Sequence, residues 1–475
     1  MDSPCFVTVG MSPFIVKNLW DRITARGGFD ISHIAHPSFD FGEWSRWTTE
    51  SPVRFFNGEL VDEMPPSDRE LLASLEGEGV PTVHNMVMSD RFVCNLPYEL
   101  ALRYATFVTR RLLELYRELK PSAIIGGFDS LHGSLGFAVA KREKIPWFAL
   151  CFSSLPRGQV AVCNELTPAS MITFEPLRVE ALRESAERIL YEFENRSIEA
   201  AAYIPPRLFS MSFILKQIPT QLGAIPKVIQ RRRRKRFLQF TNSKNSYSLA
   251  GLIHEAVRLR KNVWQLPVEL MCSHPGERKY AFFGLHTQPE SSIDVWAHFF
   301  SDQVRVIELM ARSLPPTHTL YVKLHKSDAP NYSKDALRKL AGFPGVRLVS
   351  PSADTFSYIK RADLIFAIQG TIGLEGALLG KPVIMFGDSP IKRFPGVSTF
   401  GRTIDLPQLV RDKLRQAPVD RASIVDALAK YLAPFYPGSS NDWTLTPADS
   451  EIEGYVHIIE LLARHVRVRR HASES

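Results

Sequence analysis

A glycine turn between a buried strand and a helix is well suited to hold an anion in this sequence. The apolar run 364–368 leads through Gly370 into Thr371, where an apolar helix is predicted to begin. Free amides at a helix start, with the Thr371 hydroxyl, suit a phosphate. Glu375 lies one turn further on the same face, where its carboxylate could accept hydrogen bonds from a ribose diol. A tight turn, a helix cap and a solvated acid would explain the same residues without a ligand. A Glu within an otherwise apolar helix favours ligand binding.

Lys323 and His325 form a second candidate cluster at the end of the predicted strand Leu320–Leu324. Side chains two residues apart on a strand lie on one face, so both would be aimed at the same space. Beside a phosphate site, two such donors would neutralise a diphosphate or phosphodiester leaving group. An edge-strand lysine and a surface histidine are the plainer alternative for either residue alone. Their coincidence with the Gly370 turn in one sheet favours a shared binding role.

Two further strand-end loops carry polar residues that a fold alone does not require. Gln288 and Glu290 follow the predicted strand Tyr280–Gly284, and Ser352 follows the predicted strand Val346–Val349. Capping of the next helix explains Glu290 nearly as well as ligand binding does. Ser352 belongs to a turn and cap, and could also approach a base or ribose. These residues complete the predicted donor site.

Asp129 and His132 are the candidate catalytic residues in the first half of the chain. Asp129 follows a buried strand and two glycines, which places its carboxylate at the mouth of a sheet. An acid there, facing a phosphate site, could deprotonate an acceptor hydroxyl. Capping of the helix that starts near Leu131 is an equal alternative.

Strands and helices alternate in both halves of the chain, which predicts an α/β fold with two Rossmann-like domains. Ligands of open parallel sheets bind beyond the carboxyl ends of the strands, where the loops above are found. Between the halves lies a charged, proline-interrupted region with no strand pattern. The predicted divisions are an N-terminal domain, a helical linker or insertion, a C-terminal nucleotide-binding domain and a final helix with a basic tail, at 1–170, 171–270, 271–440 and 441–475.

Composition and missing motifs exclude several classes of protein. With 45% hydrophobic and 23% charged residues in 475, the chain is not disordered as a whole. It has no apolar stretch long enough for a membrane span and no signal-peptide pattern, and its five cysteines are scattered, which predicts a cytoplasmic location. There is no P-loop, GxSxG or HExxH motif. Without a DxD pair we expect no metal and no cofactor, so that the helix dipole and cationic side chains neutralise a donor's phosphates.

The basic run Arg231–Arg236, followed by Phe237 and Leu238, accounts for much of the formal charge of +8. Such a run could rest on the anionic inner-membrane surface, where each cation contributes about 1 kcal/mol. A solvated helical face is at least as good an explanation. Nucleic-acid binding is not expected, because no motif for it accompanies the run.

The segment 280–391 resembles the capsule polysaccharide biosynthesis family of bacterial glycosyltransferases. The resemblance rests on the order and spacing of short runs, which are Gln288-Pro289-Glu290, Asp302-Gln303, Leu314-Pro315, Tyr321-Val322-Lys323-Leu324-His325, Leu348-Val349-Ser350-Pro351, Gly370-Thr371-Ile372-Gly373-Leu374-Glu375 and Gly380-Lys381-Pro382-Val383-Ile384-Met385-Phe386-Gly387. It implies a GT-B arrangement, in which an acceptor domain and a nucleotide-sugar domain face a cleft and the final helix, about 452–466, crosses back to the first domain. In relatives a His-Pro pair meets the donor phosphate; here it reads His325-Lys326.

Together, the residues and the resemblance predict a metal-independent glycosyltransferase. It would move a sugar from a nucleotide-sugar donor, with CMP-linked donors among the options, to a capsule or lipopolysaccharide acceptor that could be lipid-linked. Three alternatives remain open: a sugar-nucleotide epimerase, a glycerophosphotransferase of the same fold, and a catalytically degenerate scaffold protein.

Overall fold

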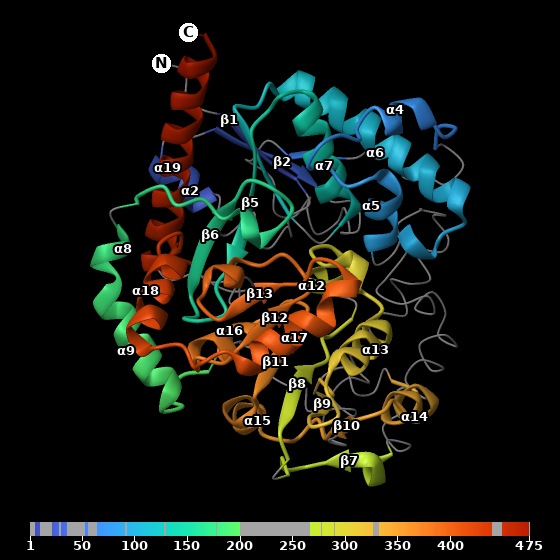
Figure 1. The fold of residues 1–475 in the computed structure, drawn as a ribbon. Helices are drawn as coiled ribbons and strands as arrows, with labels where there is room; N and C mark the ends of the chain where they lie inside the picture. Colours follow the sequence, from blue (N-terminus) through green and yellow to red (C-terminus); the bar gives the residue numbers. More distant parts are fainter. Residues whose placement is uncertain are drawn as a thin grey trace, which may run out of the picture.

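The computed structural model is built around two seven-stranded sheets (Figure 1). The ranges that the structure describes are 5–9, 21–27, 30–35, 53–55, 64–90, 93–127, 130–176, 178–199, 267–276, 278–288, 290–325, 332–438 and 449–474. Because Asp129, Lys326 and the run 231–236 lie outside these ranges, the predictions for them are not tested by the structure.

The N-terminal sheet has the strand order β14-β6-β5-β4-β1-β2-β3. Its strands are β1 (Cys5–Val9), β2 (Asp30–Ala35), β3 (Val53–Phe55), β4 (Ala123–Gly126), β5 (Trp147–Phe152), β6 (Gln159–Cys163) and β14 (Tyr436–Pro437). Neighbours from β5 to β3 run parallel, whereas β6 and β14 pair antiparallel at the edge. The connections between parallel strands therefore need helices.

The C-terminal sheet has the order β13-β12-β11-β8-β9-β10-β7 and is parallel throughout. Its strands are β7 (Met271–Cys272), β8 (Tyr280–Gly284), β9 (Thr319–Lys323), β10 (Val346–Val349), β11 (Leu364–Ala367), β12 (Val383–Met385) and β13 (Val397–Thr399). Strands β8 and β11 are apolar and buried along their whole length, as expected for a parallel sheet that helices cover on both faces.

Helices cover both faces of each sheet, as expected for an α/β fold. In the first half they are α2 (Asp21–Gly27), α4 (Arg69–Ala73), α5 (Val83–Ser89), α6 (Tyr98–Leu119), α7 (Leu131–Arg142), α8 (Arg178–Ala181) and α9 (Arg183–Glu194). In the second half they are α12 (Ser291–Asp294), α13 (Gln303–Ser313), α14 (Lys334–Ala341), α15 (Thr355–Arg361), α16 (Thr371–Leu378), α17 (Leu406–Arg415), α18 (Arg421–Leu432) and α19 (Asp449–Glu474). The fold is thus the predicted pair of Rossmann-like domains, which confirms the fold class.

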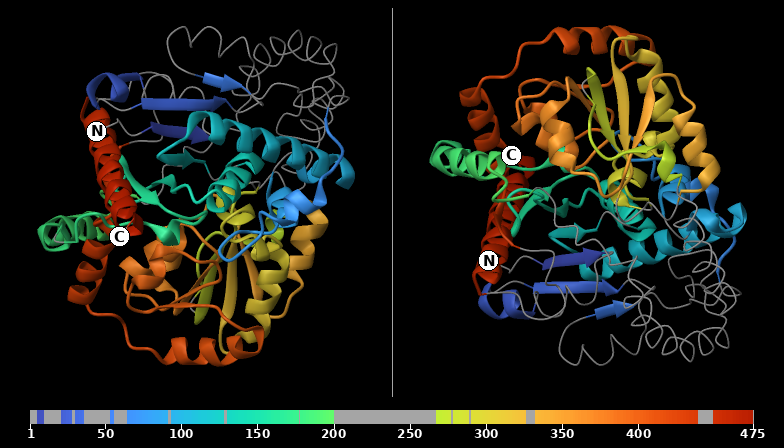
Figure 2. Two further views of the ribbon diagram at one scale, coloured as in Figure 1. Left: turned by 90° about the horizontal axis from the view of Figure 1, so that it is seen from above. Right: turned by 90° about the horizontal axis from the view of Figure 1, so that it is seen from below.

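The chain returns to the first domain after the second sheet is complete. Strand β14 pairs with β6, and the next helix, α19, lies along the N-terminal domain (Figure 2). Ile452, Tyr455 and Leu462 of this helix are buried in one apolar cluster with Phe6 and Phe148 of the N-terminal sheet. This return is the predicted crossover helix, and it ties the two domains together.

Two other contacts join parts of the chain that are distant in sequence. Helix α9 packs against α18, and its Leu190 and Phe193 belong to the apolar cluster on one face of the C-terminal sheet. Trp296, from the second domain, packs against the core of the first. Helix α9 and the residues just after it therefore lie on the C-terminal domain, beside the carboxyl ends of its strands.

Candidate functional site

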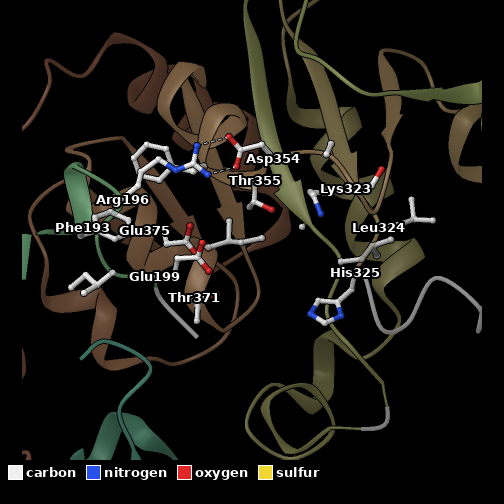
Figure 3. Close-up of a pocket in the computed structure, with 17 residues that line it drawn as sticks. Phe193, Arg196, Glu199, Lys323, Leu324, His325, Asp354, Thr355, Thr371 and Glu375 are labelled. Atoms are coloured by element: carbon white, nitrogen blue, oxygen red, sulfur yellow. Dashed lines mark hydrogen bonds and ion pairs between the residues drawn. The ribbon is translucent and has the colours of Figure 1, made fainter. Parts of the chain in front are cut away.

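A cavity of about 610 Å³ opens at the carboxyl ends of the central strands β8, β9, β10 and β11 (Figure 3). Residues that line it come from the loops after these strands and from the segment after α9. They are Phe193, Arg196, Ile198, Glu199, Gly284, Leu285, Lys323, Leu324, His325, Ser352, Ala353, Asp354, Thr355, Phe356, Thr371, Ile372 and Glu375. The cavity lies where the rule for open parallel sheets places a ligand.

Five of the predicted donor-binding residues line this cavity together. They are Lys323, His325, Ser352, Thr371 and Glu375. The register of the sheet explains the convergence, because Lys323 pairs with Gly284 of β8 and Val349 of β10 at the ends of three adjacent strands. Residues from four separate loops thus share one space.

Lys323 and His325 are fixed at the end of β9 by neighbouring loops. The Lys323 side chain is only 6% exposed, and its Nζ donates to the carbonyl oxygen of Pro351 at 3.1 Å. The His325 Nδ1 lies 2.8 Å from the Thr287 hydroxyl. A buried ammonium attracts an anion more strongly than an exposed one, because the surroundings screen its charge less.

Helix α16 begins at the cavity with a glycine that no other residue easily replaces. Gly370 has φ +83° and ψ −171°, and as a glycine at the N-cap position it offers the helix amides no side-chain cap. A Cβ on Gly370 would lie 3.1 Å from the Cε1 of His286. The first amides of α16 therefore form a donor group at the positive end of the helix dipole, as predicted for an anion site, whereas the Thr371 hydroxyl donates to Glu375.

His286 contacts this turn, and it was not among the predicted site residues. Its Nε2 lies 3.5 Å from the Gln369 amide nitrogen, and its own amide donates to Gln303 Oε1 at 2.8 Å. Burial, with a smaller effect of His325, lowers the pKa of His286 to about 3. The imidazole is therefore neutral near neutral pH, and positive charge at the site comes from other groups.

Glu375 is the carboxyl group of the site whose ionisation is most affected by its surroundings. Burial raises its pKa to about 7, against the lowering effect of a hydrogen bond from the Thr371 hydroxyl. The Glu199 carboxylate adds to the rise, whereas Lys323 opposes it. The arrangement places a polar pair one helical turn apart on α16, as the sequence spacing predicted.

Gln288 and Glu290 do not line the cavity, in contrast to their expected position. Gln288 accepts from Gln303 Nε2 at 2.8 Å and donates to Asp294 at 3.0 Å. Glu290 is exposed at the start of α12, and its carboxylate accepts from the Ser292 hydroxyl at 2.9 Å. Both side chains are thus drawn into polar contacts around α12 and α13, and their donor-binding role stays a prediction.

His132 lies inside the N-terminal domain rather than at an open surface. It is 2% exposed in the first turn of α7, and its Nε2 lies 2.8 Å from the Tyr104 hydroxyl. Asp90 accepts from the Leu131 amide at the start of the same helix, at 2.7 Å. The catalytic role assigned to His132 therefore requires a change in this packing, and it stays a prediction.

Comparison with known proteins identifies the family. The family model described as "Capsule polysaccharide biosynthesis protein" matches residues 186–430, which is just over half of the chain. The protein belongs to the capsule polysaccharide biosynthesis protein family. A search of curated proteins finds no match.

Solved structures similar to this family member include two transferases and an epimerase. A Thermosulfurimonas dismutans KpsC, beta Kdo 2,4 transferase, is 14% identical with a TM-score of 0.38, over 73% of this chain and 94% of that one. A KpsC beta Kdo 2,7 transferase from the same organism is 11% identical with a TM-score of 0.33, over 74% and 89%. The UDP-GlcNAc 2-epimerase of Methanocaldococcus jannaschii is 12% identical with a TM-score of 0.27, over 90% and 98%.

Within the described ranges, no three or more His, Cys, Asp or Glu side chains are grouped so that they could hold a metal ion. In the same part of the chain, no helix is both long and apolar enough to span a membrane.

Proposed function

We propose that this capsule polysaccharide biosynthesis protein is a glycosyltransferase that moves a sugar from a nucleotide-sugar donor to a surface-polysaccharide acceptor. The observation that carries the proposal is the cavity at the ends of β8 to β11, because it separates two kinds of group. Lys323, His325 and the amides of α16 would bind phosphate, and Glu375 would bind the ribose.

The phosphate-binding groups of the cavity suit the release of the nucleotide from the sugar. When the bond between the sugar and the phosphate breaks, negative charge grows on the phosphate oxygens. A lysine, a histidine and a helix N-terminus fixed beside those oxygens stabilise that charge without reorganising. We propose that they do so in place of a metal ion. The acceptor hydroxyl would lose its proton to a base on the N-terminal domain, for which Asp129 is the candidate.

A direct test is nucleotide binding by the purified protein. Thermal shift and calorimetry with CMP, CDP, UDP and GDP should find a ligand that raises the melting temperature, because it binds the folded state only. Lys323→Ala should weaken that ligand at least tenfold, since a charged hydrogen bond is worth about 1.5–3 kcal/mol. Lys339→Ala, an exposed lysine on α14, is the matched control. Equal affinities of both variants and wild type would disprove the phosphate site.

Turnover then separates the transferase from its alternatives. A transferase needs an acceptor glycan, an epimerase alters the donor sugar without one, and a glycerophosphotransferase releases CMP from CDP-glycerol. A chelator such as EDTA should leave the transferase rate unchanged if donor binding requires no metal. Asp129→Asn should reduce turnover strongly while nucleotide affinity stays constant.

The basic run Arg231–Arg236 gives this function a proposed membrane partner. It would hold the enzyme at an anionic lipid surface, where a lipid-linked acceptor would be available. The full chain should co-sediment with vesicles containing anionic lipid at low salt but not with neutral vesicles. Replacing the six cations with glutamine should abolish this difference.

A further inference from the structure

The short segment 195–199, here called the strap, follows α9 and forms one wall of the candidate donor cavity. It belongs to the helical region between the two domains, in which the sequence predicted no donor-binding residue. Arg196, Ile198 and Glu199 of the strap all line the cavity. The helical region thus contributes side chains to a site that otherwise consists of strand-end loops.

Arg196 fixes the strap to the first turn of α15. Its guanidinium donates two hydrogen bonds to Asp354, each of 3.0 Å, and lies 5.1 Å from the ring centroid of Phe356. Phe193 packs edge-to-face on the same ring, at 5.6 Å. Burial opposes ionisation of Asp354, but hydrogen bonds from Ser357 and the pairing with Arg196 hold its pKa below the usual value. A two-pronged ion pair stacked on an aromatic ring restricts both position and direction.

The strap brings Glu199 towards Glu375. Figure 3 shows their carboxylates pointing toward one another, from the strap and from α16. The electrostatic effect of Glu199 on Glu375 is consistent with this closeness. Thr371, Lys323 and Asp354 are the other polar groups that act on Glu375. One end of the cavity is therefore acidic, whereas the end at Lys323 and His325 offers cations and hydrogen-bond donors.

We propose that Glu199 and Glu375 together bind the ribose diol of the donor nucleotide, and that Arg196 is the positioning residue that holds Glu199 there. This inference rests on the proposed function. An ionised carboxylate only accepts hydrogen bonds, and a diol offers two adjacent O–H donors, one for each carboxyl group. The phosphate would then lie at the first amides of α16, and the ribose about one helical turn away, at Glu375.

The first experiment compares ribonucleotides with their 2′-deoxy and 3′-deoxy forms by calorimetry, with CMP, UMP and GMP and these deoxy forms as probes. Glu199→Gln should weaken the best ribonucleotide about tenfold, since it removes one charge-assisted hydrogen bond. The same variant should change the affinity of one deoxy form, the one that lacks the hydroxyl bound by Glu199, less than threefold. Glu187→Gln, an exposed residue of α9, is the control and should match wild type with every ligand. A Glu199→Gln effect equal for the ribonucleotide and both deoxy forms would overturn the ribose assignment.

A second experiment tests the positioning role of Arg196. Arg196→Gln should show the same preference for weakening the ribonucleotide, and the double variant with Glu199→Gln should be no weaker than the worse single variant. Arg183→Gln, which removes a surface ion pair with Asp426 on α18, is the control. Additive losses in the double variant would overturn the positioning role.

Pyrophosphate binding separates failure of this inference from failure of the proposed function. Because pyrophosphate has no ribose, Glu199→Gln should leave its affinity unchanged, whereas Lys323→Ala should weaken it. If nucleotides bind and Lys323→Ala weakens them but Glu199→Gln does not, only the role of Glu199 is refuted. If wild type binds neither nucleotides nor pyrophosphate, the proposed function and the inference both fail.

Discussion

Replacing Glu375 with glutamine should stabilise the ligand-free protein, and increasingly so at higher pH. The folded protein keeps the Glu375 proton up to a pKa of about 7, whereas the unfolded chain releases it near 4.5. Stability from this group is therefore present below about pH 4.5 and is lost as the pH rises through about 7. The full difference corresponds to about 3 kcal/mol at alkaline pH.

Thermal unfolding of wild type and Glu375→Gln at about pH 5 and about pH 8 measures this difference. Most of the pH-dependent loss of wild-type stability falls within that interval. The difference in free energy of unfolding between Glu375→Gln and wild type should therefore grow by about 2 kcal/mol. For a domain of this size, the gap between the two melting temperatures should widen by about 4–8 °C. Subtracting the wild-type melting temperature from that of the variant at each pH removes the contributions of other titrating groups.

Two further variants show whether the environment described for Glu375 is correct. Glu199→Gln should reduce the pH-dependent gap, because it removes a negative neighbour. Glu187→Gln, exposed on α9, should show no gap at either pH. A gap for Glu375→Gln that is constant with pH, or that reverses at higher pH, would refute the buried carboxyl beside Glu199.

Three further substitutions test the packing that positions the site. Gly370→Ala should reduce the free energy of unfolding by about 1–3 kcal/mol, because only glycine adopts this backbone conformation readily, and the melting temperature measures the loss. It should also weaken nucleotide binding, measured by calorimetry, because the added Cβ would press on His286 and shift the turn. Gly454→Ala should destabilise the protein, although alanine has a higher helix propensity than glycine by about 1 kcal/mol. The reason is that the new Cβ would lie 2.0 Å from the Pro437 carbonyl oxygen, so a raised melting temperature would contradict this contact. Leu462→Ala, at a fully buried position of α19, should cost about 2–5 kcal/mol in urea unfolding, and a smaller loss would mean that α19 does not cover the sheet.

The central strands and the loops after them could be predicted from sequence alone. The ranges 280–284 and 346–349 are correct to the residue. The first is buried along its whole length and forms a continuous apolar run with clear ends, whereas the second is apolar except for the exposed Arg347. Lys323 and Thr371 follow from this, since parallel strands bring their ends to one edge. The edge strands β13 and β14, of three and two residues, were not predicted, because so short a run carries no such pattern. Strand β6 was also not predicted, although its residues are mostly apolar and buried.

Contacts between distant segments explain what the sequence did not show. In the sequence, residues 293–314 look like one continuous helix, but the structure has two helices there, α12 and α13. Between them Trp296 packs against the other domain, and Asp302 caps α13. Glu199 could not be assigned to the site, because its position depends on a pair between Arg196 and Asp354, which are 158 residues apart. Only packing in three dimensions reveals such a residue.

The return of the chain to the N-terminal sheet has a consequence for folding during synthesis. Of the described strands of that sheet, all but β14 lie within residues 5–163, and the apolar face under α19 stays exposed until residues 449–474 have left the ribosome. The described strands of the C-terminal sheet all lie within residues 271–399. The domain translated second can therefore complete its sheet first. Until α19 packs against it, the N-terminal domain has an exposed apolar surface that a chaperone would recognise.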